Sequence, residues 1–309
     1  MDHRAFLTTL TAEQRQSLTQ KSDVKGLLHL VLHWGAIAFF GWLIFLRVPG
    51  WPVLMLPQGI LLVFLFTLLH ETSHSTPFQT EWLNKWIGRV SGFVIFLPSL
   101  WFRYFHFAHH RFTQVPGKDP ELESPKPETV RQYLVHMSGI PVWLSHFRTL
   151  IRNASAQSND SFVPQGKRTL IRDEARLLVV VYGVIALTSI ALKSSAMLYV
   201  WLVPIILGQP FLRLYLLAEH GRCAFVSNML ENSRTTFTNR AVRALAWNMP
   251  YHAEHHSFPT VPFHQLPFLH TLISPHLVET ENGYARFNVK YAAGLSGPRK
   301  KEQDLHPKS

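Results

Sequence analysis

The chain has 309 residues, of which 47% are hydrophobic and only 16% are Asp, Glu, Lys or Arg, whereas typical soluble domains carry about 25% charged residues. This deficit argues against an ordinary soluble enzyme and excludes a disordered chain. The single cysteine excludes a disulfide scaffold and any cysteine-ligated zinc or iron–sulfur site, and the net charge of +11 suits an anionic membrane surface as well as nucleic acid.

Four long apolar stretches follow a polar N-terminal segment, residues 1–26, that shows no signal-peptide pattern. Their lengths are close to what a helix needs to cross the hydrocarbon layer of a bilayer. We therefore predict four membrane-spanning helices, at residues 27–46, 53–69, 177–192 and 196–218. Short connections join the first to the second and the third to the fourth, so we expect two antiparallel hairpins. Gln209 and Arg213 interrupt the last stretch, whose final turns should therefore face protein rather than lipid.

The segments outside these spans should form a mainly helical cap made of residues 70–176 and 219–309. A fifth apolar run, residues 90–102, is too short to span and predicts an interfacial or re-entrant helix. Two stretches rich in Pro, Gly and small polar residues, 115–128 and 153–166, predict loops. The predicted fold is an all-α membrane protein, with residues 1–309 in a single integral-membrane domain.

The distribution of basic residues predicts the orientation of this fold. Of the 30 Lys and Arg residues, 27 lie in the N-terminal segment and in the two parts of the cap. An excess of basic residues marks the cytoplasmic side of a membrane protein. We therefore expect both termini and the cap in the cytoplasm, and the two short hairpin turns on the opposite side.

Three histidine clusters are the most informative feature of the sequence. They read HETSH at 70–74, HFAHH at 106–110 and HAEHH at 252–256. The spacings i, i+4 and i, i+3, i+4 place the histidines of each cluster on one face of a helix. Because neutral imidazole is a good ligand for Zn, Fe, Cu and Ni, these eight imidazoles predict a metal site.

The predicted topology favours one shared site. An even number of predicted spans precedes each cluster, so all three clusters lie on the side of the N-terminus. Three or five spans would instead separate the third cluster from the other two. Apolar length and charge, not the histidines, define the spans, so this agreement is independent support for a shared site.

The first cluster also fits a different interpretation. HETSH matches the H-E-x-x-H motif of zinc peptidases, in which Glu71 would be the general base for metal-assisted peptide hydrolysis. That interpretation needs one further ligand and leaves at least five clustered histidines without a role. A shared multi-histidine site explains more of the sequence.

The three clusters, in this order around four spans, resemble the three histidine boxes of the membrane fatty acid desaturase superfamily. That superfamily contains acyl desaturases, alkyl-chain hydroxylases, and carotenoid hydroxylases and ketolases. The stretch NMPYHAEHHSFPTVP at 248–262 is similar to the surroundings of the third box, and HHRFTQ at 109–114, with Asp119 and Glu121 beyond it, resembles the second. The resemblance covers about residues 25–270, and its boxes are specific for the superfamily rather than for one reaction.

This resemblance implies a non-haem di-iron centre on the cytoplasmic side, bound mainly by histidines. The eight box histidines correspond to ligands, and superfamily members often add one more histidine from the end of the fourth span, where His220 is the best match here. The implied ligands of the two irons are His70, His74, His106, His109, His110, His220, His252, His255 and His256. No catalytic side chain beyond these ligands is implied.

Four polar residues near the boxes have alternative interpretations. Glu71 and Glu254 are candidates to orient ligand imidazoles, although Glu254 lies about 200° from the first histidine of its box around a helix and equally fits a solvated residue. Asp119 either hydrogen-bonds a histidine of the second box or forms a turn. Asn248 either holds a water on iron or caps the local structure.

Three further residues are less promising. His29 and His33 lie inside the first predicted span at i, i+4 spacing, and polar groups within a membrane are functional candidates. The superfamily has no box at that place, so we do not expect them to bind metal. Cys223 is most simply a packed thiol.

The resemblance predicts an O2-dependent oxidation of an unactivated C–H bond in a lipid, with fatty-acyl desaturation as the leading reaction. The alternative is hydroxylation or ketolation of an alkyl chain, a carotenoid or a smaller lipophile. A different class of function is a non-catalytic membrane protein that stores or senses metal. The chain has no His-Pro-Gly-Gly haem-binding segment and no cysteine-rich redox module, so an enzyme of this kind would take electrons from a separate ferredoxin, rubredoxin or cytochrome b5. We expect membrane lipids, and no nucleic acid, as further partners.

Overall fold

The computed structural model describes residues 1–295, so the part of the predicted cap at 296–309 lies outside the described residues. Four of the described helical segments are long and apolar enough to cross a membrane, and each coincides with one of the predicted spans: Ala12–Phe45, Trp51–Ser73, Gln165–Ala191 and Leu198–His220. Their elements are α3 (Asp23–Phe45), α4 (Trp51–Val63) with α5 (Leu65–Ser73), α10 (Arg168–Ala191), and the short π-helix η3 (Leu198–Leu202) with α11 (Val203–His220).

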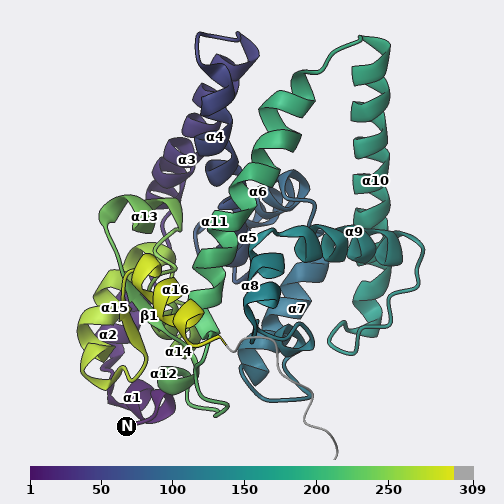
Figure 1. The fold of residues 1–309 in the computed structure, drawn as a ribbon. Helices are drawn as coiled ribbons and strands as arrows, with labels where there is room; N and C mark the ends of the chain where they lie inside the picture. Colours follow the sequence, from purple (N-terminus) through teal and green to yellow (C-terminus); the bar gives the residue numbers. More distant parts are fainter. Residues whose placement is uncertain (296–309) are drawn as a thin grey trace, which may run out of the picture.

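Three of these helices form the centre of the apolar part. Figure 1 shows α3 and α4 beside one another, with α11 crossing α4. At the crossing, Gly59 of α4 meets α11 backbone to backbone, since a Cβ atom on Gly59 would lie 1.9 Å from the carbonyl oxygen of Pro204. Gly208 of α11 makes the reciprocal contact with Gly59. Small residues allow such close approach of helices within membranes.

The helix α10 stands apart from this centre. Only 6% of its most apolar window is buried, compared with 56% for the window in α4 and α5. Figure 1 shows α10 and α11 joined at one end and diverging towards the cap. Instead of α11, α10 packs against α9 (Ile140–Ala154) and α7 (Ser99–Phe112).

The fifth apolar run is not one helix, so that prediction is wrong in detail. It contains the end of α6 (Glu81–Val94), a turn, and the start of α7, and Phe96 in the turn has a φ of 58°. The turn packs between two spans, because Tyr182 of α10 donates to the carbonyl oxygen of Phe93 and Trp201 of η3 donates to that of Val94, each at 2.8 Å. The run therefore enters the apolar part and returns, as a re-entrant segment does.

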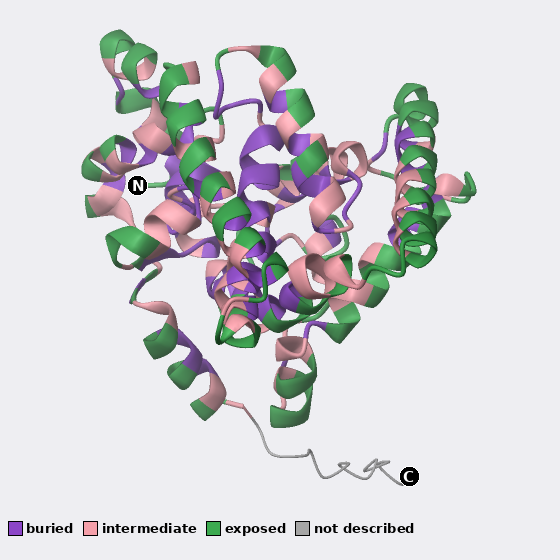
Figure 2. Cartoon of the chain, turned by 90° about the horizontal axis from the view of Figure 1, so that it is seen from above, coloured by how far each residue is buried: buried purple, intermediate pink, exposed green. Residues whose placement is uncertain are grey.

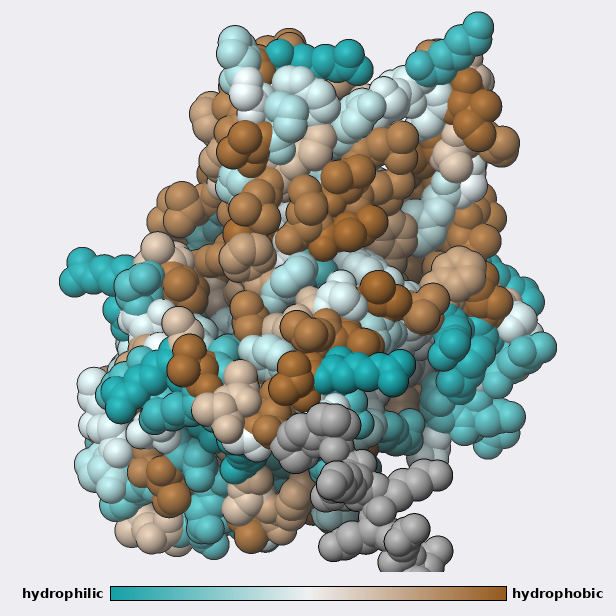
Figure 3. Space-filling model, in the orientation of Figure 1, coloured by the Kyte–Doolittle hydropathy of each residue, from teal (hydrophilic) through white to brown (hydrophobic). Residues whose placement is uncertain are grey.

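The surface divides into two zones. Figure 3 shows hydrophobic surface over the upper parts of α3, α4, α10 and α11, and mostly hydrophilic surface below. The helix α9 crosses α10 part-way along its length, near this boundary (Figure 1). Its exposed apolar residues, spaced as one helical face, are Ile140, Leu144, Phe147 and Ile151. An apolar face of this kind is typical of a helix that lies at a membrane interface.

The cap consists of short helices and one small sheet. Its other helices are α1 (His3–Thr9), α2 (Ala12–Leu18), α8 (Val130–Met137), α12 (Met229–Asn232), α13 (Arg240–Leu245), α14 (His252–Ser257), α15 (Leu266–Ile273) and α16 (Tyr284–Ala293). The 3₁₀ turns are η1 (Pro120–Glu123), η2 (Gln165–Lys167), η4 (Phe263–Gln265) and η5 (Ser274–His276). Two strands, β1 (Thr235–Phe237) and β2 (Thr280–Asn282), pair in parallel.

The helical segment that contains the second predicted span is longer than that span. It continues through α5 to Ser73, beyond residue 69, so the first histidine cluster lies at the last turn of this helical segment. Figure 2 shows the buried residues gathered at the centre of the molecule. The largest of the fully buried side chains is Trp247, and Leu68 and Leu69, next to the first cluster, belong to the same core. The core thus joins the spans to the histidine-bearing part of the cap.

Candidate metal centre

The nine predicted ligands come from four helices that are distant in sequence. The first cluster lies at the end of α5, the second in the last half of α7 and the third on α14, while His220 is the last residue of α11. All nine side chains are buried or nearly so. The fold therefore brings all the sequence-predicted ligands to one place.

The nine imidazoles form two adjoining groups. The five-histidine group contains His70, His74, His106, His110 and His255, whose nearest ring nitrogens lie within 4.8 Å of one another. The four-histidine group contains His109, His220 and His256, which meet the same criterion, together with His252, whose Nε2 lies 2.9 Å from Nε2 of His220. The groups touch where the rings of His110 and His256 stack at 4.0 Å.

The spacing of each cluster explains this division. Residues four apart lie on one face of a helix, whereas adjacent residues point about 100° away from each other. In α7 the i, i+4 pair, His106 and His110, belongs to the five-histidine group, and His109 belongs to the other. In α14 the i, i+4 pair, His252 and His256, belongs to the four-histidine group, and His255 crosses to the five-histidine group. The two adjacent histidines of each HxxHH motif, His109 and His110 or His255 and His256, therefore belong to different groups.

The geometry fits a metal pair. The closest approaches between these rings join Nε2 to Nε2, at 2.8 Å for His74 and His106 and at 3.2 Å both for His109 and His220 and for His255 and His110. Within the described structure both nitrogens of the buried His70 ring lack a hydrogen-bond partner. Buried polar atoms are normally paired, and converging imidazole nitrogens without partners suit Fe, Zn, Cu or Ni.

Burial keeps most of these rings in the neutral form that binds metal. It lowers the pKa of His74 to about 3, with a further contribution from the charge of Arg103. Burial, followed by repulsion from neighbouring imidazoles, also lowers the pKa of five others well below the usual value: His106, His110, His252, His255 and His256. Burial acts in the same direction on His109, but the negative charges of Glu121 and Asp119 outweigh it and raise the pKa of that ring.

Sequence comparison agrees with this site. Residues 48–288 match the fatty acid desaturase family. The chain belongs to this family. It is 28% identical over 205 residues to a protein of Arabidopsis thaliana named "Sphingolipid delta(4)-desaturase DES1-like". That alignment covers 65% of the chain and 57% of the relative, so the chain spans little more than half of the relative's length.

In this desaturase-family chain, the outward nitrogens of the four-histidine group have defined neighbours. His109 Nδ1 donates to Asp119 Oδ1 at 2.9 Å, His220 Nδ1 donates to the carbonyl oxygen of Asn232 at 2.9 Å, and His256 Nδ1 lies 3.1 Å from Thr113 Oγ1. His252 Nδ1 lies 3.3 Å from Glu219 Oε1. These contacts direct Nε2 of each ring inward. Asp119 fulfils both of its predicted alternatives, because it also caps the 3₁₀ turn η1.

Four of these neighbours were not found from the sequence: Glu219, Glu121, Thr113 and Asn232. Glu121 Oε2 lies 3.4 Å from His109 Nε2, and the same carboxylate pairs with Lys126. Glu219 directly precedes His220, and Glu121 follows Asp119 by two residues, so proximity to candidate residues was the only available signal.

The structure disfavours the peptidase interpretation of HETSH. Glu71 is fully buried, and its Oε2 accepts hydrogen bonds from Thr76 Oγ1 and from the backbone N–H of Phe263, each at 3.0 Å. Its Oε1 lies 3.8 Å from His255 Nδ1. The carboxylate thus connects the first box to the segment after the third, and its other oxygen faces a ligand ring without reaching hydrogen-bond distance.

Glu254 is not a solvated residue, so that alternative is wrong. Its carboxylate is fully buried and contacts His270 Nδ1 on α15 and the Thr235 hydroxyl on β1. The helix α14 has only six residues and is flanked by irregular structure. Glu254 therefore fixes the box-three helix to two other elements, a contact that helical spacing alone does not reveal.

The remaining candidates have structural roles. His33 donates from Nε2 to the carbonyl oxygen of Leu61 at 2.9 Å and accepts at Nδ1 from Trp247 at 3.1 Å, and His29 donates to the carbonyl oxygen of Ala244. Neither ring joins the two groups. The side-chain amide of Asn248 donates to the carbonyl oxygen of Phe263 at 3.0 Å, and Cys223 is a buried, packed thiol as expected.

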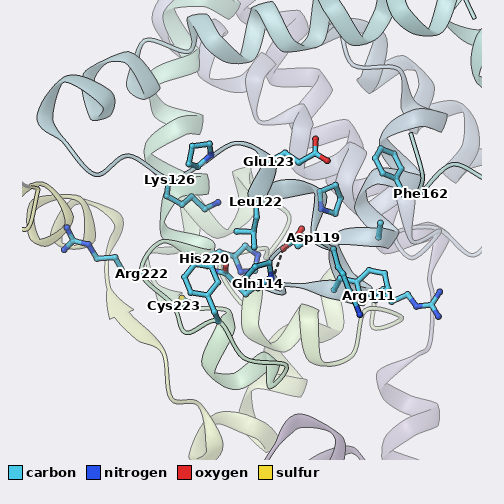
Figure 4. A pocket seen from close by; sticks show the side chains of 18 of the residues that line it. Arg111, Gln114, Asp119, Leu122, Glu123, Lys126, Phe162, His220, Arg222 and Cys223 are labelled. Carbon is cyan, nitrogen blue, oxygen red and sulfur yellow. Dashed lines mark hydrogen bonds between the residues drawn. The ribbon is translucent and has the colours of Figure 1, made fainter. Parts of the chain in front are cut away.

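A pocket of about 1180 Å³ opens beside the four-histidine group. Figure 4 shows His220, Gln114 and Asp119 at its inner end, with Arg111, Lys126 and Arg222 further out. Aromatic side chains supply much of its apolar wall: Tyr104, Phe107, Phe112, Phe162, Phe225 and Tyr291. The pocket is large enough for a drug-sized or lipid-sized molecule.

Proposed function

We propose that this chain is an integral-membrane di-iron oxidoreductase that uses O2 to oxidise an unactivated C–H bond of a lipid, with fatty-acyl desaturation as its reaction. The observation that carries the proposal is the convergence of nine buried imidazoles into two adjoining groups, in a chain that also has four helical segments long and apolar enough to cross a membrane. Family membership and the desaturase-like relative support the same reaction class.

The nine histidines would hold two irons, five on one ion and four on the other. Bound iron would supply the redox chemistry that unactivated C–H bonds require and that side-chain acids and bases cannot provide. The chain's own contribution is to keep the imidazoles neutral by burial and to direct Nε2 inward through Asp119, Asn232 and Thr113. The surrounding core excludes water from the reacting centre.

The proposed desaturation consumes one O2, two electrons and two protons for each double bond, and releases two waters. The electrons come from a separate donor of the ferredoxin, rubredoxin or cytochrome b5 type. We propose that the pocket beside His220 admits the lipid substrate, because aromatic side chains supply much of its apolar wall and its inner end reaches the four-histidine group.

We also propose a multi-pass orientation with the centre on the cytoplasmic side. The spans would form two hairpins whose turns, near Arg47 and Lys193, face the opposite side. The basic residues concentrated outside the spans support this orientation. The surface division in Figure 3 supports the membrane position.

The test is lipid mass spectrometry of cells that express the full chain, alongside a His109→Ala variant and a His220→Ala variant. Wild type should produce lipids that have lost two hydrogens, and both variants should lose turnover and bound iron. His29→Ala is the matched control, because His29 is a span histidine outside both groups, and it should keep its iron. A product that gains one oxygen would show hydroxylation instead. A fully active His220→Ala protein with normal iron would remove His220 from the ligand set.

A further inference from the structure

The two histidine groups differ in how their rings are held from outside. In the four-histidine group three outward nitrogens lie within hydrogen-bond distance of a polar partner: Asp119, Asn232 and Thr113 for His109, His220 and His256, respectively. The fourth, His252 Nδ1, makes no hydrogen bond among the described residues, but Glu219 Oε1 lies 3.3 Å from it. Each neighbour limits rotation of its ring. The inward nitrogens are therefore set in position before a metal arrives.

The five-histidine group lacks this support. Among the described residues, both nitrogens of His70 and the outward nitrogen of His110 have no hydrogen-bond partner. The nearest carboxylate, Glu71 Oε1, lies 3.8 Å from His255 Nδ1, which is beyond hydrogen-bond distance. These rings must be ordered by the metal itself.

The charged residues around the two groups also favour metal binding at the four-histidine group. Three carboxylates, those of Asp119, Glu121 and Glu219, lie within 3.4 Å of a ring nitrogen of the four-histidine group. Lys126 offsets part of the charge of Glu121, so the buried carboxylate of Asp119, 2.9 Å from His109 Nδ1, contributes most to this difference. Next to the five-histidine group, the guanidinium of Arg103 donates to the hydroxyl of Ser75, the residue after His74, at 3.4 Å, and its positive charge opposes the binding of a cation.

A carboxylate that accepts the outer N–H of a ligand imidazole makes that ligand more basic and fixes its orientation, and removal of such a partner typically lowers metal affinity by about 10- to 100-fold. We propose that the two metal positions are inequivalent, and that the four-histidine group takes up its divalent metal first and binds it more tightly. This inference rests on the proposed two-metal centre.

The experiment is a titration of the metal-free, detergent-purified full chain with Co²⁺, followed by calorimetry and by the visible absorption of the bound ion. Two steps are expected, with the first at least about tenfold tighter than the second, in keeping with the effect of such outer partners. Asp119→Asn and Glu219→Gln should each weaken the first step by about 10- to 100-fold. Two variants are used because Asp119 also caps a turn and Glu219 does not.

Glu71→Gln is the matched control, since Glu71 is equally buried but faces the five-histidine group. It should leave the first step unchanged. Two Co²⁺ ions bound in a single step of equal affinity, or weakening of the first step by Glu71→Gln alone, would overturn the inference and leave the two-metal centre intact. Fewer than two bound ions would refute the proposed centre itself.

Discussion

The backbone contact between α4 and α11 allows a quantitative test of how the membrane part positions the metal ligands. In Gly59→Ala, the new Cβ would lie 1.9 Å from the carbonyl oxygen of Pro204 and 2.9 Å from the backbone nitrogen of Gly208. Real Cβ contacts are essentially never shorter than 3.0 Å, so α11 must move by at least about 1.1 Å. Overpacking of this kind typically costs about 1–3 kcal/mol, and the obstructing atoms are backbone atoms that cannot rotate away.

This movement has a predictable effect on the metal centre. His220 ends α11, and His70 lies on α5, which continues α4. Ligand distances in metal sites are held within about 0.2 Å, so a shift of about 1 Å between these helices should disturb the ligands themselves. Loss of a residue that merely hydrogen-bonds a ligand typically lowers metal affinity by about 10- to 100-fold, and we expect this shift to lower it at least tenfold. Gly59→Ala should therefore unfold at a lower temperature in detergent and retain less iron after dialysis.

The controls are Gly35→Ala on α3 and Gly183→Ala on α10, because a Cβ at either position meets nothing within 4 Å. Both should keep the unfolding temperature and iron content of wild type, or slightly raise the former, since alanine favours helix over glycine. A Gly59→Ala protein that matches these controls in both measurements would show that the contact between α4 and α11 does not position the metal ligands.

Three further outcomes are expected. His33→Ala should destabilise the fold by about 1–3 kcal/mol per buried partner left unpaired, here the Leu61 carbonyl and the Trp247 indole N–H, without loss of iron; a drop in iron content at unchanged stability would contradict this. A nitroxide on Phe147→Cys in lipid nanodiscs should be relaxed by oxygen more than by a water-soluble nickel chelate, and the reverse would place α9 in water; the native Cys223 is buried and should not compete for the label. A reporter fused at Ser194 should appear on the external face of the membrane, and a cytoplasmic signal would refute the proposed orientation.

The elements predicted correctly are those whose signal is local. A span requires a long apolar stretch, and all four stretches are helices of sufficient length in the structure. The histidine clusters were found because spacings of three and four residues reflect helix geometry directly. Even so, the prediction that each cluster presents a single face was too simple, since His109 and His255 cross to the opposite group from their neighbours.

The elements that were missed depend on contacts between distant segments. The burial of Glu254 requires His270 and Thr235, which belong to other elements, so helical phase alone suggested a solvated residue. Glu121 becomes the neighbour of a ligand ring only when η1 packs against α7, and Glu219 only when α11 meets α14. The divergence of α10 from α11 also has no local signal, because the short connection between them permits both a tight and an open pair.

The isolation of α10 has a consequence for how its sequence can vary. Hydrocarbon chains accommodate Leu, Ile, Val and Phe alike, whereas a protein neighbour demands one shape. Outward positions such as Val184 and Leu187, which are 56% and 69% exposed, should therefore accept most apolar residues, while Gly59 and Gly208 should accept almost none. Among related chains, the third span should therefore keep its length and overall hydrophobicity while its individual residues vary. It should show the lowest sequence identity of the four spans although the fold requires it.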